Sequence, residues 1–216
     1  PGYVYGAVLY DTDDNRFLRF GTFDTYSREL SDGTGDIFPW IQPEGRVLWY
    51  AENTMDTEGG SSNGNSFALM KDTETNQFHI YKFYAYSNAY KRAYYAINSS
   101  LATGINDAKL FAFSSKRSMF LYAVGKTLYA YDYNKGYEKL YKMELDDEIT
   151  MLKFDIQSNT TYNDLYIATY NSTTGGTLQK YVLGTDQNKF ELTPDERCHW
   201  TDLVKVKDMD WRNSTK

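Results

Sequence analysis

The 216-residue chain has 41 % hydrophobic and 24 % charged residues, which is typical of a globular protein large enough to bury a core. Aromatic residues reach 17 %, including 21 tyrosines, and together with many Thr, Asn and Asp residues they favour strands joined by polar turns. The net charge of −6 disfavours nucleic acid as a partner, since phosphate binding needs a basic face. No apolar run reaches the roughly 18 residues of a transmembrane helix, so none is expected in this chain.

A hairpin pattern recurs along the chain. Its first copy, Ala7–Phe20, has an apolar stretch, an Asp-Thr turn ending in Asn-x-Phe, and a second alternating stretch. Further copies lie at Phe67–Phe83, Leu128–Leu145 and Leu178–Leu192, and their turn asparagines, Asn15, Asn76, Asn134 and Asn188, are 61, 58 and 54 positions apart. Short Asp and Asn side chains close turns and tolerate left-handed backbone, so each copy predicts a β-hairpin.

Further strands are expected before the later hairpins. They lie at Asp36–Ile41 and Gly45–Glu52, at Lys109–Phe113 and Met119–Val124, and at Ile149–Phe154 and Asp164–Tyr170. Each unit then holds about four strands, with apolar inner strands and the repeated hairpin as the outer pair, the pattern of a propeller blade. Thr201–Val206 is expected either to return to the N-terminal unit and close a ring or to begin a further blade.

Two stretches interrupt the pattern. Asn53–Ser66 is predicted to be a long polar loop, and Ser87–Gly104 a surface excursion or a short helix.

The sequence therefore predicts an all-β, β-propeller-like fold of about four four-stranded blades, with a β-sandwich as the alternative. Residues 1–216 would form a single domain or the C-terminal portion of one in a larger ring. Because the chain begins at Pro1 rather than Met, we expect it to be a piece of a longer protein.

Known catalytic motifs are missing from the sequence. It has no H-E-x-x-H, C-x-x-C or G-x-S-x-G pattern and no phosphate-binding glycine loop, so we expect no enzyme, no cofactor and no metal. His79 lies within an alternating strand and is interpreted as structural, and the single Cys198 as packing. The Asp-rich turn at Asp11 resembles the start of a calcium loop, but we interpret it as a repeat turn because it recurs at Asp72.

Interleaved charges near the C-terminus are interpreted as a solvated surface. The lysines concerned are Lys180, Lys189, Lys205 and Lys207.

Aromatic rings are the best candidates for a binding site, because a flat ring offers an apolar face with a polar rim to a sugar. The candidates are Trp40, Trp49, Trp200 and Trp211 with Tyr86, Tyr90, Tyr94 and Tyr95. Trp49 lies within a strand and fits a core role, whereas Trp40 follows Pro39 in an expected loop. The predicted ligand-binding residues are Trp40, Tyr86, Tyr90 and Tyr94.

The C-terminal two-thirds carry a run of motifs: KTLYAYDYNKGYEKLYKMELDDEITMLKFD, NDLYIATYN, GGTLQKYVLG and WTDLVKVKDMDWR. Across Leu110–Arg212, and more loosely through its N-terminal hairpins, the chain resembles the PKD-like family of Bacteroidetes surface lipoproteins. The resemblance implies an exported protein with Ig-like or PKD-like modules upstream, held at the outer membrane by a lipid anchor before Pro1. It implies an accessory role beside a TonB-dependent receptor that imports glycans or peptides, and it brings no agreed site residues.

The leading functional hypothesis is a non-enzymatic cell-surface binding module that holds a glycan or peptide for such an uptake system. The alternatives are a structural module that docks an outer-membrane receptor, and a propeller glycoside hydrolase or lyase acting through paired carboxylates.

Overall fold

The structure of the chain is a computed structural model, which describes residues 3–4, 8–11, 16–19, 23–24, 46–56, 63–71, 76–84, 91–98, 100–114, 118–134, 138–154, 164–186 and 188–209. Among these, side chains are described from residue 69 onwards, except at 81–84 and 91–95. The chain divides into two compact units, one made of residues 1–52 and 63–97, the other of residues 53–62 and 98–216.

The first unit contains one four-stranded sheet and two short strand pairs. The four-stranded sheet has the order β5-β6-β7-β8, and the pairs are β1-β4 and the hairpin β2-β3. The bounds are Tyr3–Val4 for β1, Val8–Asp11 for β2, Arg16–Arg19 for β3, Phe23–Asp24 for β4, Arg46–Asp56 for β5, Asn63–Lys71 for β6, Phe78–Tyr84 for β7 and Lys91–Ala96 for β8.

Two expectations for the stretches beside these strands were wrong. The stretch Asn53–Ser66 is strand at both ends, because β5 extends to Asp56 and β6 begins at Asn63. The stretch Ser87–Gly104 contains β8, which pairs with β7, so β6-β7 forms the middle of its sheet instead of the outer pair. Ladder hydrogen bonds override weak local strand preference in both places. The strand expected at Asp36–Ile41 lies outside the described residues.

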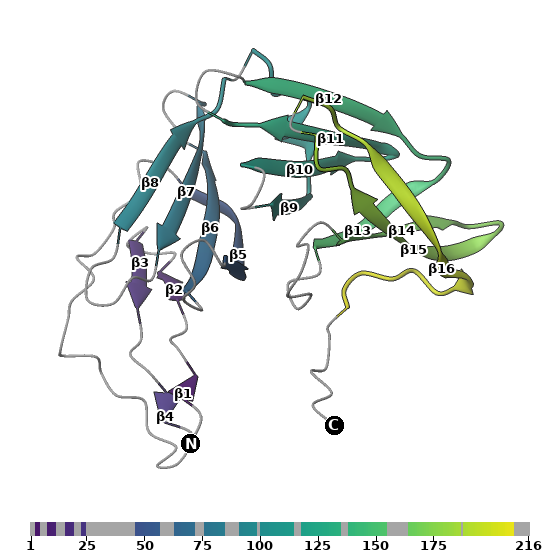
Figure 1. Cartoon of the computed structure of the whole chain (residues 1–216), viewed down its shortest axis with the longest axis horizontal. Helices are drawn as coiled ribbons and strands as arrows, with labels where there is room; N and C mark the ends of the chain where they lie inside the picture. The colour runs from purple at the N-terminus through teal and green to yellow at the C-terminus, as the bar shows by residue number, and fades with distance from the viewer. Residues whose placement is uncertain are drawn as a thin grey trace. The chain divides into compact units, whose positions relative to one another are not determined.

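The second unit is built from two four-stranded antiparallel sheets with the orders β9-β10-β11-β12 and β13-β14-β15-β16 (Figure 1). The bounds are Leu110–Ser114 for β9, Met119–Val124 for β10, Thr127–Asp132 for β11, Lys139–Glu144 for β12, Glu148–Phe154 for β13, Asp164–Asn171 for β14, Gly175–Leu183 for β15 and Leu192–Leu203 for β16. A single 3-10 turn, η1 (Ile105–Asp107), is the helical element of the described residues.

All four predicted hairpins are present. In chain order they are β2-β3, β6-β7, β11-β12 and β15-β16. Asn76 adopts the left-handed backbone with φ 57°, as expected for a turn asparagine. In the last two copies an aspartate closes the turn, since Asp132 Oδ1 accepts from Asn134 N at 2.9 Å and Asp186 Oδ1 accepts from Asn188 N at 2.9 Å.

Burial in the second unit falls from the first strand of each sheet to the last. Strands β9, β10 and β13 are almost wholly buried, whereas β12 and β16 alternate between exposed and half-buried residues. This gradient confirms the expected apolar inner strands, and within each outer hairpin the last strand is the exposed one.

The core of this unit lies between its two sheets. Leu121 and Leu128 of the first sheet and Leu165 and Ile167 of the second are at most 1 % exposed and belong to one apolar cluster. The phenylalanine of the fourth repeat turn extends this cluster, because the ring of Phe190 lies 5.8 Å from that of Tyr141 on β12.

The opposite face of the β9–β12 sheet is aromatic. Phe120 stacks with Phe113 and Tyr122, and Tyr122 stacks in turn on Tyr129. The Tyr122 hydroxyl donates to Thr103 O at 2.8 Å, in the segment that follows residue 97. Burial raises the pKa of the Tyr122 hydroxyl above its ordinary value. This face explains part of the high tyrosine content.

The chain is therefore all-β and propeller-like, as predicted, with three four-stranded antiparallel sheets and two strand pairs among the described residues.

Candidate functional site

The residues predicted to bind a ligand fall largely outside the described part of the chain. Trp40, Tyr86 and Tyr90 lie outside the described residues, as does Trp211. Tyr94 is on β8, opposite Tyr81 of β7. The predicted cluster of rings therefore stays a prediction.

Trp200 is the sequence candidate whose side chain is described, and it is 45 % exposed. It lies on β16, the outermost strand of its sheet, directly opposite Leu178 of β15. Leu178 pairs in turn with Ala168, and Ala168 with Met151. Residues directly opposite share a face, and these four lie outside the core cluster, so they form one row on the sheet's other face. We call the surface around this row the far face; it points away from the β9–β12 sheet (Figure 1).

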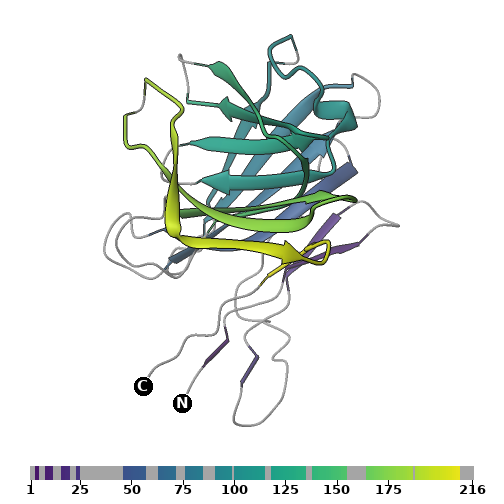
Figure 2. The same cartoon turned by 90° about the vertical axis from the view of Figure 1, so that its right-hand side faces the viewer.

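The edge strand β16 is interrupted by a wide bulge. Tyr181 pairs with Pro194 and Gln179 pairs with His199, so Lys180 alone faces the four residues 195–198. The Gln179 side chain fixes the bulge by donating to Asp195 O at 2.9 Å. Figure 2 shows β16 bending along its length, as a bulge requires. The bulge, next to Pro194, makes this sheet edge a poor template for pairing with another strand.

A fixed group of charges occupies the far face beside the bulge. Lys180 Nζ lies 2.8 Å from Asp164 Oδ2 and 3.5 Å from Asp195 Oδ2. Arg197 forms a bidentate ion pair with Asp195, with Nε 3.0 Å from Oδ1 and Nη2 3.1 Å from Oδ2. The Arg197 side chain is 88 % exposed, so one edge of the group faces solvent.

Three of these groups, Asp195, Lys180 and Arg197, stay charged across the neutral pH range. The hydrogen bonds from Arg197 lower the pKa of the Asp195 carboxyl to about 2. The hydrogen bond to Asp164 raises the pKa of the Lys180 ammonium, and Asp195 raises the pKa of the Arg197 guanidinium. Groups that stay charged in this way suit the binding of polar groups better than proton transfer at neutral pH.

The sequence interpretation of this region was partly wrong. Lys180 was expected on a solvated surface, but its side chain is only 17 % exposed and pairs with two carboxylates. Lys189, by contrast, is exposed as expected. The missed signal is the turn after Asn171, which sets the register of β14 and β15. That register places Tyr166 opposite Lys180, and Asp164 then lies two residues away on the same face.

Other sequence candidates have structural positions. His79 is buried in β7, within the strand where the sequence placed it. Cys198 is half-buried in the bulge and His199 is exposed beside it. In the part of the chain with described side chains, no three metal-ligating residues gather into one site.

Thr201–Val206 is neither a returning strand nor the start of a further blade. Its first three residues complete β16, where Leu203 pairs with Gly176 of β15. Residues 201–203 therefore belong to the ladder between β15 and β16. Within the described residues, no helix is both long and apolar enough to cross a membrane.

Comparison with known proteins finds no match by sequence and a weak similarity by structure. No protein-family profile matches the sequence, and no curated protein matches it either. Among solved structures, the β-propeller domain of Cps50 (Swd1) from Myceliophteria thermophila is similar over 89 % of this chain and 73 % of that chain, with 8 % identity and a TM-score of 0.44. The all-β architecture is established here by the strand pairing itself.

Proposed function

We propose that this chain is a non-enzymatic binding module that captures a glycan or peptide on the far face of its β13–β16 sheet. The observation that carries the proposal is Trp200, exposed on the outermost strand and on the same sheet face as a fixed group of charges. An indole ring offers an apolar plane to a sugar ring or an apolar side chain, and its N–H is a hydrogen-bond donor.

The charges supply the polar part of such a site. Lys180 Nζ lies 2.8 Å from Asp164 Oδ2, and Arg197 Nε lies 3.0 Å from Asp195 Oδ1. These ion pairs set the orientation of the four side chains before a ligand binds. Preorganised polar groups lower the ordering cost of binding. The two acids and two bases balance in charge, which favours a neutral or zwitterionic ligand over a strongly charged one.

The wider setting is also part of the proposal, and it rests on the family resemblance. In that setting the chain belongs to an exported lipoprotein anchored in the outer membrane through an upstream segment. Its ligand would be a glycan or peptide that a TonB-dependent receptor then imports.

A docking module for a protein partner is the second candidate. It is favoured by the exposed apolar side chains Val182, Trp200 and Val204, which lie on or beside the same sheet. Protein interfaces use exposed aromatic anchors in this way.

The test is a binding screen of the purified chain against glycan and peptide panels, followed by calorimetry on each hit. Trp200→Ala should weaken a true hit by about tenfold or more, equivalent to about 1.4 kcal/mol, whereas Trp200→Tyr should retain most of the affinity. Lys142→Ala, on the exposed β12, is the matched control and should bind as the parent does. Trp40→Ala tests the residue favoured by sequence alone.

The outcomes separate the candidates. A hit that ignores Trp200→Ala refutes this site. A folded protein that binds nothing in either panel but captures an outer-membrane receptor shifts the function to docking.

A further inference from the structure

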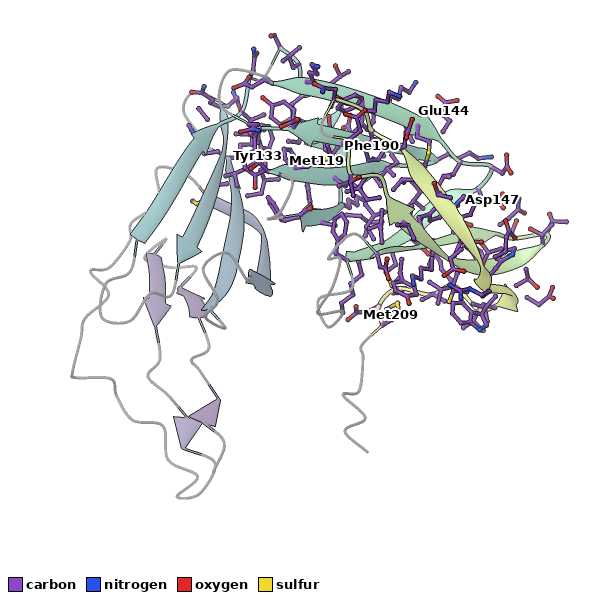
Figure 3. All side chains as sticks on the ribbon, in the orientation of Figure 1. Met119, Tyr133, Glu144, Asp147, Phe190 and Met209 are labelled. Atoms are coloured by element: carbon purple, nitrogen blue, oxygen red, sulfur yellow. The ribbon has the colours of Figure 1, made fainter. Side chains whose placement is uncertain are left out.

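The residues after β16 lie across the far face. We call Val204–Met209 the C-terminal strap. It has no strand or helix, and it passes on the side of the β13–β16 sheet away from β9–β12 (Figures 1 and 3). Glycine permits the crossing, because a Cβ at Gly176 would come 2.5 Å from Val204 O.

Side chains of the sheet hold the strap in place. Thr150 Oγ1 donates to Val206 O at 2.6 Å, and Lys153 Nζ donates to Asp208 Oδ1 at 2.8 Å and to Met209 O. Since Thr150 precedes Lys153 as Val206 precedes Asp208, the strap runs in the same direction as β13.

Lys205 adds two contacts near the start of the strap. Its Nζ lies 3.5 Å from Glu148 Oε1 and 5.6 Å from the centroid of the Tyr170 ring. The sheet thus presents a carboxylate and an aromatic face to a cation, a hydroxyl to a carbonyl, and an ammonium to a carboxylate.

The strap passes beside the buried end of the row that begins at Trp200, because it is bonded to Thr150 and Lys153, between which Met151 lies in β13. Along that row Trp200 is 45 % exposed, whereas Ala168 and Met151 are buried. Thr150, bonded to the strap, adjoins Met151 and is buried as well. The strap therefore lies on a part of β13 that adjoins the candidate row.

The hold on the strap is weak in kind. Within the described residues it makes no backbone–backbone hydrogen bond to the sheet. One of its ion pairs joins a half-buried Lys153, 33 % exposed, to Asp208, which is 78 % exposed, and water and salt reach such a pair and screen it. The groups of the strap that the sheet binds are a backbone carbonyl, an ammonium and a carboxylate, which other extended peptides also carry.

Resting on the proposed binding function, we propose that β13 and β14 carry a peptide-binding surface that the strap of the same chain occupies. The ligand that replaces the strap is an extended peptide from another molecule, with a basic residue, an aliphatic residue directly after it, and a carboxylate two positions further on. Lys205, Val206 and Asp208 of the strap show this spacing. The free protein is then autoinhibited, and a ligand that displaces the strap gains the whole row from Met151 to Trp200.

The test uses the full chain with the strap loosened by Lys205→Ala and Asp208→Ala together. The probe is a fluorescent synthetic peptide with the sequence of residues 204–209, followed by anisotropy. We expect the loosened variant to bind it at least tenfold more tightly than the parent. Adding Lys153→Met should abolish the gain, and Asn in place of Asp in the peptide should reduce it. Each single variant changes one exposed side chain and should give an intermediate affinity.

The inference is overturned by no peptide binding to the loosened variants, by equal binding to parent and loosened chains, or by binding that survives Lys153→Met. Concentration-dependent dimers of the loosened variant, seen by light scattering, would make a second copy the occupant and overturn the peptide assignment. A glycan hit that depends on Trp200 but not on the strap leaves the proposed function standing without this inference. Peptide binding to the loosened variant with no hit in the panels upholds this inference and limits the proposed function to peptides that bind the surface under the strap.

Discussion

Replacing Ile167 by Ala should destabilise the second unit strongly. Ile167 is 1 % exposed, in the cluster between the two sheets. The change removes three carbons, a loss of about 2.4 kcal/mol in burial alone at about 0.8 kcal/mol each. The residual cavity adds to this, and the total for such changes is about 2–5 kcal/mol.

The assay is urea unfolding followed by far-UV circular dichroism. At a slope of about 2 kcal/mol per molar urea, a loss of about 3 kcal/mol lowers the midpoint by about 1.5 M. Leu178→Ala is the matched control, because Leu178 lies on the far face of the same sheet and is half-buried. Half the burial predicts about 1 kcal/mol.

The comparison can refute the reasoning. If Ile167→Ala lowers the midpoint no more than Leu178→Ala does, the packing of the β9–β12 sheet on the β13–β16 sheet is not what stabilises the unit. Ile167→Val gives a graded check, at about 0.5–1.5 kcal/mol.

Three further predictions follow from particular contacts. Gly176→Ala should displace the strap, since the new Cβ would lie 2.5 Å from Val204 O, and trypsin should then cut at Lys205 faster than in the parent; an unchanged rate would contradict this. Because the pKa of Asp195 is held at about 2, its ionised carboxylate should stabilise the fold above about pH 4, where an unfolded carboxyl is ionised, and this stability should be lost as the pH falls through about 2. In an NMR titration Arg197→Ala should raise the titration midpoint of Asp195, and an unmoved midpoint would count against the pairing. A double-mutant cycle of Tyr141→Ala and Phe190→Ala should give a coupling of about 0.5–1.5 kcal/mol in urea unfolding, whereas additivity would show that the rings do not interact.

The sequence alone determined the hairpins and their faces, because these depend on neighbours along the chain. A turn aspartate and the asparagine two positions after it bond locally, as at Asp132 and Asp186, and the flanking residues alternate by the geometry of the strand. Strand β10 matches its predicted bounds, and the inner strands are buried as the apolar runs required.

Only the tertiary structure decided what depends on pairing between distant segments. β8 has no clear alternation in its sequence and became a strand because β7 offered it a ladder. The charges around Lys180 meet because the strand register and the bulge of β16 bring three strands to one point. The strap is placed by Thr150 and Lys153, which lie more than 50 positions earlier in the chain. No local pattern encodes such contacts, since a shift of one residue in register turns every side chain of a strand to the other face.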